Sequence, residues 1–193
     1  YDSWLEFFGL PIFYLPYFQH PDPTIRRKSG LLYASLNSSS DLGTIVKTPY
    51  YWNISPHEDA TFTPIIMSGA PPILDLEYRK KPMDGEFNSS SSITINSDNN
   101  GAFNKKDGEY DLRGHLLSEG RFDINDTWRW GFDAKHASDD TYMRRFGFGS
   151  FAQLNSKIFT EAFRNNSYFS AKSYMFQGLQ DGDVQGEIPI ILP

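Results

Sequence analysis

Strict alternation runs through the stretch Leu74-Asp75-Leu76-Glu77-Tyr78-Arg79, in which apolar side chains take turns with charged ones. Successive side chains of a β-strand point to opposite faces of its sheet, so this stretch predicts a strand with one apolar and one charged face. The same two-faced pattern recurs over residues 110–116 and 128–135. The sequence therefore predicts antiparallel β-structure whose apolar side chains gather on one face.

Turn-forming residues separate these runs, and no apolar period of 3.6 residues lasts longer than two turns. Clusters of Gly, Pro, Asn, Asp and Ser lie at residues 37–41, 68–72, 82–85, 98–108, 125–127, 165–167 and 181–186. They divide the chain into about ten strands of roughly eight to twelve residues, near the ~9–11 that cross a bilayer at a tilt. Strand length thus favours a transmembrane β-barrel over a soluble sandwich.

Composition narrows the class of protein further. Hydrophobic residues make up 39% of the 193 residues, and none of the apolar runs is long enough for a membrane-spanning helix. Aromatic residues reach 16%, which suits either the aromatic girdles of a barrel or the sugar platforms of a soluble sandwich. A net charge of −6 argues against a general nucleic-acid binder, and the absence of Cys removes disulfides and thiolate metal sites.

The first 29 residues differ from the rest. Residues 10–18 are apolar on both faces and contain two prolines, which restricts them to an edge or bulged strand. Residues 20–24 then read as a stiff linker, because two prolines hold the preceding residues extended. We therefore predict the end of a separate β-domain with its linker over residues 1–29, and a second unit over residues 30–193.

Motifs that would carry chemistry are weak. The four histidines never stand at the i, i+4 spacing of a zinc protease motif, so no metal site or cofactor is expected. The 24 acidic residues supply many carboxylates for glycoside hydrolysis but no preferred pair. No catalytic residue is predicted, and the chain is not expected to be an enzyme. A soluble carbohydrate-active β-sandwich stays open as an alternative.

A series of short motifs resembles the LPS-assembly protein family LptD, also called the organic solvent tolerance protein family. The most specific motif is Thr48-Pro49-Tyr50-Tyr51-Trp52-Asn53-Ile54-Ser55-Pro56. The others follow in the family's order at residues 15–18, 20–24, 26–32, 59–64, 76–79, 139–142 and 174–179. The resemblance extends over essentially the whole chain and is weak only at residues 86–108.

The resemblance implies a periplasmic β-jelly-roll followed by a very large outer-membrane β-barrel, with this chain holding the last jelly-roll strands and the first strands of the barrel. It implies transport of lipopolysaccharide into the outer leaflet through a lateral gate between the first and last barrel strands. The implied partners are lipopolysaccharide, outer-membrane lipids, the plug lipoprotein LptE and the periplasmic LptA bridge. The lipid path at the junction is then expected to include Phe13, Tyr14, Tyr17 and Phe18.

Two further groups of residues gain an expected role from the resemblance. Prolines in the first barrel hairpin weaken strand pairing because they cannot donate a backbone hydrogen bond. Pro49 holds one such position, whereas Ala34 stands where the family commonly has a second proline. The basic triplet Arg26, Arg27 and Lys28 follows the linker, where it could contact lipid phosphates or simply form a solvated turn. A porin or receptor barrel shares the strand alternation, but it should lack the proline-rich segment at residues 10–24.

Overall fold

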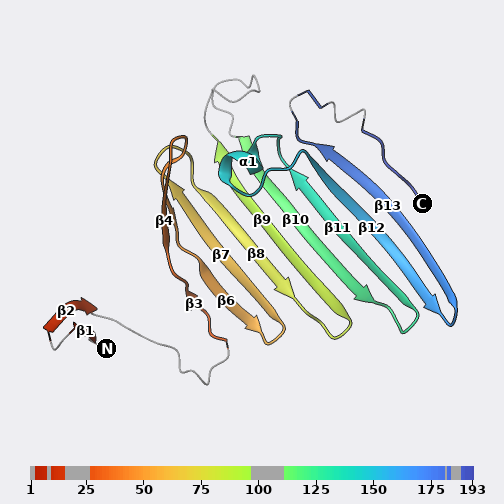
Figure 1. Cartoon of the computed structure of the whole chain (residues 1–193), viewed down its shortest axis with the longest axis horizontal. Helices are drawn as coiled ribbons and strands as arrows, with labels where there is room; N and C mark the ends of the chain where they lie inside the picture. Colours follow the sequence, from red (N-terminus) through yellow and green to blue (C-terminus); the bar gives the residue numbers. More distant parts are fainter. Residues whose placement is uncertain (1–2, 8–9, 16–26, 97–110, 181, 184–187) are drawn as a thin grey trace.

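The structure, a computed structural model, describes residues 3–7, 10–15, 27–96, 111–180, 182–183 and 188–193. These residues form antiparallel strands and a short helix, which confirms the predicted all-β class (Figure 1). The elements are β1 (Ser3–Phe7), β2 (Leu10–Leu15), β3 (Gly30–Leu31), β4 (Ser35–Ser39), β5 (Gly43–Lys47), β6 (Tyr50–Ser55), β7 (Glu58–Met67), β8 (Ile73–Lys80), β9 (Gly85–Asn96), β10 (Asp111–Asp123), β11 (Trp128–Ala137), α1 (Tyr142–Phe146), β12 (Gln153–Arg164) and β13 (Ser167–Gly178).

The described residues form two sheets. β1 and β2 pair only with each other, with Leu5 opposite Phe13 and Trp4 opposite Tyr14. The large sheet has the order β13-β12-β11-β10-β9-β8-β7-β5-β4, and each strand from β7 to β13 pairs with its neighbour in the sequence. This up-and-down meander is the topology of an antiparallel barrel wall. That residues 1–29 and 30–193 are separate domains remains a prediction.

The register of the large sheet sorts side chains onto two faces, as the alternation predicts. Leu76 lies opposite Phe62 on one side and Ser91 on the other, and Ser91 lies opposite Leu116. We call the face that carries these side chains the apolar face. Glu77, which follows Leu76 on β8, points to the opposite face, which we call the polar face. There it lies opposite Thr61 and Ser90. The apolar face is open to the surroundings, with Leu74 46% exposed, Ile93 49% and Ile158 54%.

The two ends of the large sheet differ in their connections. At one end, which we call the short-turn end, strands are joined through residues 56–57, 81–84, 124–127 and 165–166. At the other, the long-loop end, the connections are residues 40–42, 68–72, 97–110 and 138–152. The longest connection in the described part of the chain, residues 138–152, lies at the long-loop end, although residues 40–42 there form a short turn. Short turns at one end and long loops at the other are typical of outer-membrane barrels, whose short turns face the periplasm.

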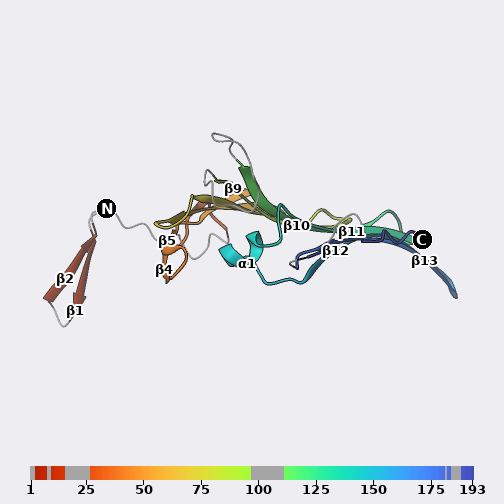
Figure 2. The ribbon, with the colours of Figure 1, turned by 90° about the horizontal axis from the view of Figure 1, so that it is seen from above.

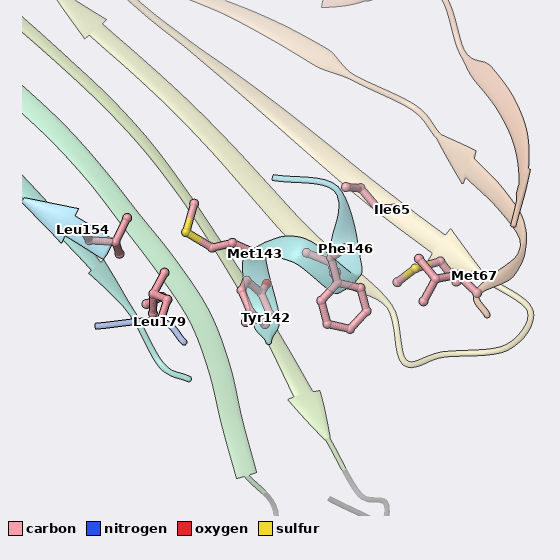
Figure 3. Packing of buried hydrophobic residues seen from close by; sticks show 10 residues of the cluster. Ile65, Met67, Tyr142, Met143, Phe146, Leu154 and Leu179 are labelled. Atoms are coloured by element: carbon pink, nitrogen blue, oxygen red, sulfur yellow. The ribbon is translucent and has the colours of Figure 1, made fainter. Parts of the chain in front are cut away.

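The buried core lies at the long-loop end, where residues 138–152 fold back over the polar face. Figure 3 shows Phe146 of α1 on the side of Ile65 and Met67 of β7, and Met143 of α1 extending toward Leu154 of β12; all five belong to one buried cluster. Seen edge-on, α1 lies to one side of the sheet (Figure 2). The helix ends at Gly147, whose φ of 77° lies in the left-handed region that favours glycine. The loop therefore covers part of the polar face and leaves the apolar face open.

In the part of the chain that the structure describes, no helix has the length and apolar character needed to cross a membrane.

Candidate functional site

The first hairpin of the large sheet is interrupted in both of its strands. β3 pairs with β6, and β4 pairs with β5, so residues 30–39 run alongside residues 43–55 as two broken strands. The predicted strands of eight to twelve residues are therefore wrong here, because the longest unbroken piece in this hairpin is the six-residue β6. The predicted lengths hold for β7 to β12 within a residue, and β13 has 12 residues.

The break contains a β-bulge. Leu32 donates its backbone N–H to the carbonyl of Pro49 at 2.8 Å, and Ser35 lies opposite Lys47. Two residues, Tyr33 and Ala34, separate these positions on the first strand, whereas Thr48 alone separates them on the second. The extra residue makes Tyr33 and Ala34 a bulge, which ends regular pairing on this strand.

Two prolines lie at the same level as the bulge. Pro49 accepts the hydrogen bond from Leu32 but has no N–H to return. In the next ladder Thr48 stands opposite Pro64 of β7, and its N–H donates to the Pro64 carbonyl at 3.3 Å. Pro64 likewise has no N–H to return. The hairpin thus lacks backbone bonds on both sides of residues 48 and 49.

The structure brings the two predicted hairpin residues together, since Ala34 is in the bulge and Pro49 borders it. That they belong to a gate remains a prediction. Pro64 was not among the hairpin residues predicted from the sequence, although a proline between apolar and threonine residues that read as a strand is a signal of weakened pairing.

Charged side chains of the polar face pair across neighbouring strands. Asp133 of β11 contacts the Arg121 Nη2 of β10 at 2.6 Å and the Lys157 Nζ of β12 at 2.8 Å. Near the short-turn end the buried carboxylate of Asp59 accepts a hydrogen bond from the Arg79 Nε at 2.8 Å. These pairs give the polar face a dense array of charges and hydrogen-bonding groups over β7 to β12.

The structure describes some of the residues expected at the junction between the jelly-roll and the barrel. Arg27 reaches Asp59 with its Nη1 at 3.4 Å and so fixes the start of the large sheet to β7, whereas Lys28 is exposed. Phe13 and Tyr14 lie in β2. Tyr17, Phe18 and Arg26 lie outside the described residues. The proposed lipid-phosphate contact and lipid path at these residues therefore remain predictions.

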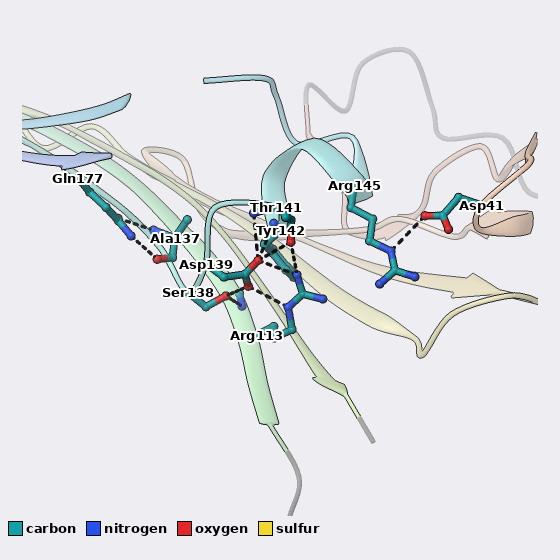
Figure 4. A network of polar contacts seen from close by, with 10 residues as sticks. Asp41, Arg113, Ala137, Ser138, Asp139, Thr141, Tyr142, Arg145 and Gln177 are labelled. Atoms are coloured by element: carbon teal, nitrogen blue, oxygen red, sulfur yellow. Dashed lines mark hydrogen bonds and ion pairs between the residues drawn. The ribbon is translucent and has the colours of Figure 1, made fainter. Parts of the chain in front are cut away.

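Asp139 organises the loop at residues 138–152 (Figure 4). Its carboxylate receives two hydrogen bonds from Arg113 of β10, from Nε at 2.8 Å and from Nη2 at 2.7 Å, and the Tyr142 N–H donates to it at 2.9 Å. Burial alone would raise the pKa of Asp139, but the hydrogen bonds from Arg113, Thr141 and Ser138 and the Arg113 charge lower it well below its usual range. The carboxylate is thus held in its charged form.

Two more contacts tie the same loop to the sheet. The Tyr142 hydroxyl lies 2.7 Å from the Ser92 Oγ of β9, and burial raises the pKa of Tyr142. The Arg145 Nε donates to Asp41 at 3.1 Å, which links α1 to the connection between β4 and β5 (Figure 4). The loop therefore spans from β10 to the tip of the interrupted hairpin. From the sequence, Asp139 stood only within a family motif at residues 139–142, and its pairing with Arg113 could not be predicted because the two residues are distant in the sequence.

The arrangement suits separation of apolar groups from polar groups, because these gather on opposite faces of one sheet. Among the described residues, no group of three or more His, Asp or Glu side chains could hold a metal ion. What the fold brings together is an open apolar face, a charged polar face partly covered by one loop, and a weakly paired first hairpin.

Comparisons with known proteins agree with this arrangement. The family model described as LPS transport system D matches residues 111–193. An LPS-assembly protein LptD from Idiomarina loihiensis is 37% identical over 144 residues, which are 74% of this chain and 18% of that protein. One from Pseudoalteromonas translucida is 34% identical over 169 residues, 86% of this chain and 21% of its own length. One from Neisseria meningitidis serogroup B is 34% identical over 140 residues, which are 72% of this chain and 16% of that protein. The chain spans about a fifth of the length of these curated relatives.

Proposed function

Because the chain belongs to the LptD family of LPS-assembly proteins, we propose that it forms part of an outer-membrane β-barrel that assembles lipopolysaccharide into the outer leaflet. The observation that carries this proposal is the division of the large sheet into two faces. The apolar face faces lipid, and the polar face lines a lumen through which the saccharide moves. Strands β9, β10, β12 and β13 have 12 or 13 residues, enough to cross a bilayer at a tilt.

The interrupted first hairpin supports a lateral gate. An edge that already lacks backbone hydrogen bonds at Pro49 and Pro64 needs less free energy to separate from a neighbouring strand. Lipid tails would leave the lumen sideways through this seam while the saccharide stays on the polar face. The bulge at Tyr33 and Ala34 interrupts the pairing without the second proline that the family commonly has there.

The remaining parts of the proposal follow from the family. The sheet of β1 and β2, with Phe13 and Tyr14, belongs to the end of a periplasmic jelly-roll that receives lipopolysaccharide from an LptA bridge. The plug lipoprotein LptE contacts the polar face inside the barrel. The protein is located in the outer membrane with its N-terminal part in the periplasm, and it acts as a transporter rather than an enzyme.

The soluble sandwich is the weaker alternative. A sandwich buries its apolar faces against a second sheet. In the described part of the chain, the loop at residues 138–152 covers the polar face, and large side chains such as Leu116 and Ile158 remain exposed on the apolar one. A lipid-facing role accounts for this exposure.

The test is depletion of the full-length protein in the cells that make it. We expect newly made lipopolysaccharide to stop reaching the surface, measured as binding of an antibody to intact cells, and to recover when the full-length protein is restored. A porin serves as the control, because its loss should leave surface lipopolysaccharide unchanged. Normal delivery in depleted cells would contradict the proposal.

A further inference from the structure

A cleft at the short-turn end of the polar face carries four cationic side chains in its lining. Its volume is about 260 Å³, and its lining includes Arg27, Arg79, Lys80 and Lys81. We propose that this cleft binds the phosphate groups of the transported glycolipid as it reaches the lumen. The proposal rests on the proposed function, and it assigns a binding site for one chemical class of group within it.

The cleft is built from segments that are far apart in the sequence. Arg27 lies three residues before the start of β3, His57 lies in the turn between β6 and β7, and Arg79 belongs to β8. The Lys81 backbone N–H donates to the His57 carbonyl at 2.8 Å, which holds the two neighbouring turns together. The Arg27 Nη1 donates to the Pro56 carbonyl at 3.4 Å. These contacts hold the segments that carry the cationic side chains in fixed positions relative to one another.

The lining carries more positive than negative charge. Its four cations face two carboxylates, Asp59 and Glu86, in a chain whose net charge is −6. Lys80 is paired with Glu58 at 3.5 Å outside the lining. Even with that pair neutralised, one positive charge remains in excess. A local surplus of cations in an acidic protein is an electrostatic feature that attracts anions.

The pairing of Asp59 with Arg27 and Arg79 does not remove the excess positive charge of the cleft. The Arg79 Nε at 2.8 Å already gives Asp59 a short, charge-assisted bond, and Arg27 is the more distant partner at 3.4 Å. Both arginine side chains remain more than half exposed, 51% for Arg27 and 57% for Arg79. Among the described residues Lys81 has no ion-pair partner. The cleft thus offers two planar guanidinium groups and an ammonium group, which suit phosphate oxygens.

The position of the cleft fits a glycolipid that arrives from the N-terminal side. Arg27 is the first described residue after the segment that connects β2 to the large sheet. A phosphorylated headgroup that follows this segment meets the polar face at the short-turn end, where the cleft lies. Phosphate binding there would hold the saccharide on the polar face while the acyl chains stay outside it.

The experiment uses the full-length protein in detergent and two probes, lipid A carrying both phosphates and the same lipid A with its phosphates removed. Equilibrium dissociation constants are measured for the wild type, Lys81→Gln, and Lys81→Gln combined with Arg27→Gln. Lys135→Gln is the matched control, since it removes one exposed cation from the same face outside the cleft. Inorganic phosphate is added as a competitor in a separate arm.

We expect phosphorylated lipid A to bind about two- to fivefold more weakly to Lys81→Gln and about tenfold more weakly to the double variant. Dephosphorylated lipid A should bind all variants equally, and Lys135→Gln should match the wild type. Competition by millimolar inorganic phosphate would support a site that takes the free anion as well, and its absence a site that needs the lipid-bound group.

Unchanged affinity in the double variant, or an equal loss for both lipids, would overturn the cleft assignment while the transport function stands. Failure of the wild-type protein to bind either lipid would overturn both proposals together.

Discussion

Pro49 has a defined place in the backbone ladder. Its carbonyl accepts from Leu32, and the N–H and carbonyl of one strand residue point to the same side. A residue with an N–H at position 49 would therefore donate back to Leu32. We expect Pro49→Val to add this bond together with a good strand former, and to stabilise the hairpin by about 1 kcal/mol. A firmer seam should open less often.

The measurement for Pro49→Val is surface lipopolysaccharide in cells whose only copy is the full-length variant, at matched protein levels. Pro71→Val is the control, because Pro71 lies in the connection between β7 and β8, outside the first hairpin and outside the cleft near Arg79. We expect reduced delivery for Pro49→Val and normal delivery for Pro71→Val. Equal, normal delivery by both variants would exclude a role for Pro49 in the seam.

Leu76 and Glu77 test which face meets lipid. They are adjacent on β8, so they differ in face and hardly at all in depth. If Leu76 faces lipid near the midplane, Leu76→Arg should lower the free energy of unfolding by about 2 to 4 kcal/mol. Glu77→Arg, on the exposed polar face, should be nearly neutral. The check is equilibrium unfolding of the full-length protein in lipid, and equal effects of the two changes would refute the assignment of the faces.

At the scale of elements, the loop at residues 138–152 depends on one carboxylate. The side chains of Arg113 and Asp139 are only 14% and 11% exposed, so their bidentate pair is mostly shielded from water. Asp139→Asn keeps the shape but loses the charge, and we expect it to destabilise the docked loop by about 1.5 to 3 kcal/mol. Hydrogen exchange of the backbone amides at residues 141–148 should then become faster, with the amides of β12 and β13 unchanged. Unaltered exchange in the loop would contradict this role for Asp139.

The same carboxylate sets the pH dependence of docking. The pKa of Asp139 in the folded protein is lowered from its ordinary 3.8, so its stabilising effect is complete above that value and is lost as the pH falls toward the folded pKa. Loop protection, corrected for intrinsic exchange rates, should therefore be equal at pH 8 and pH 5. A loss of protection between pH 8 and pH 5 that is absent in Asp139→Asn would contradict the low pKa.

Elements with a regular pattern could be predicted from the sequence, and interrupted ones could not. β8, β10 and β11 lie where alternation predicts them, because each carries one row of apolar side chains and one row of polar side chains on opposite faces. The breaks in the first hairpin could not be predicted, because they depend on how Pro49 and Pro64 are placed across neighbouring strands. That placement is set by the register of the sheet. The helix α1 could not be predicted either, because five residues are too few to show a helical period of apolar residues.

The candidate site was predictable in part for the same reason. Ala34 and Pro49 came from the family resemblance, and the structure places them at one interruption. The Arg113–Asp139 pair and the cleft near Arg79 join residues far apart in the sequence. Their partners are set by strand register and by how a loop folds back. Local sequence patterns do not carry that information.

At the scale of the whole molecule, the large sheet has two edges whose backbone groups are largely unpaired and one face whose apolar side chains are exposed. β4 and β13 end the strand order, and among the described residues only Ile191 pairs with β13 on its outer side, opposite Tyr174. Open edges of long strands invite pairing with other chains. The apolar face adds exposed side chains such as Leu74, Ile93 and Ile158. Both features favour association with lipid or with further strands.

We therefore expect these 193 residues, expressed without the rest of the protein, to aggregate in plain buffer and to remain dispersed only in detergent. The open edges leave backbone groups unpaired, and in lipid each such group costs several kcal/mol, so detergent should keep the chain soluble without giving it the stability of a closed barrel. Light scattering after size-exclusion chromatography measures the association state, and chemical unfolding measures cooperativity. The full-length protein in the same detergent is the control and should unfold cooperatively. A monomer of the 193 residues that unfolds cooperatively in plain buffer would mean that the apolar face is buried within the chain itself, and it would favour the soluble sandwich over the barrel wall.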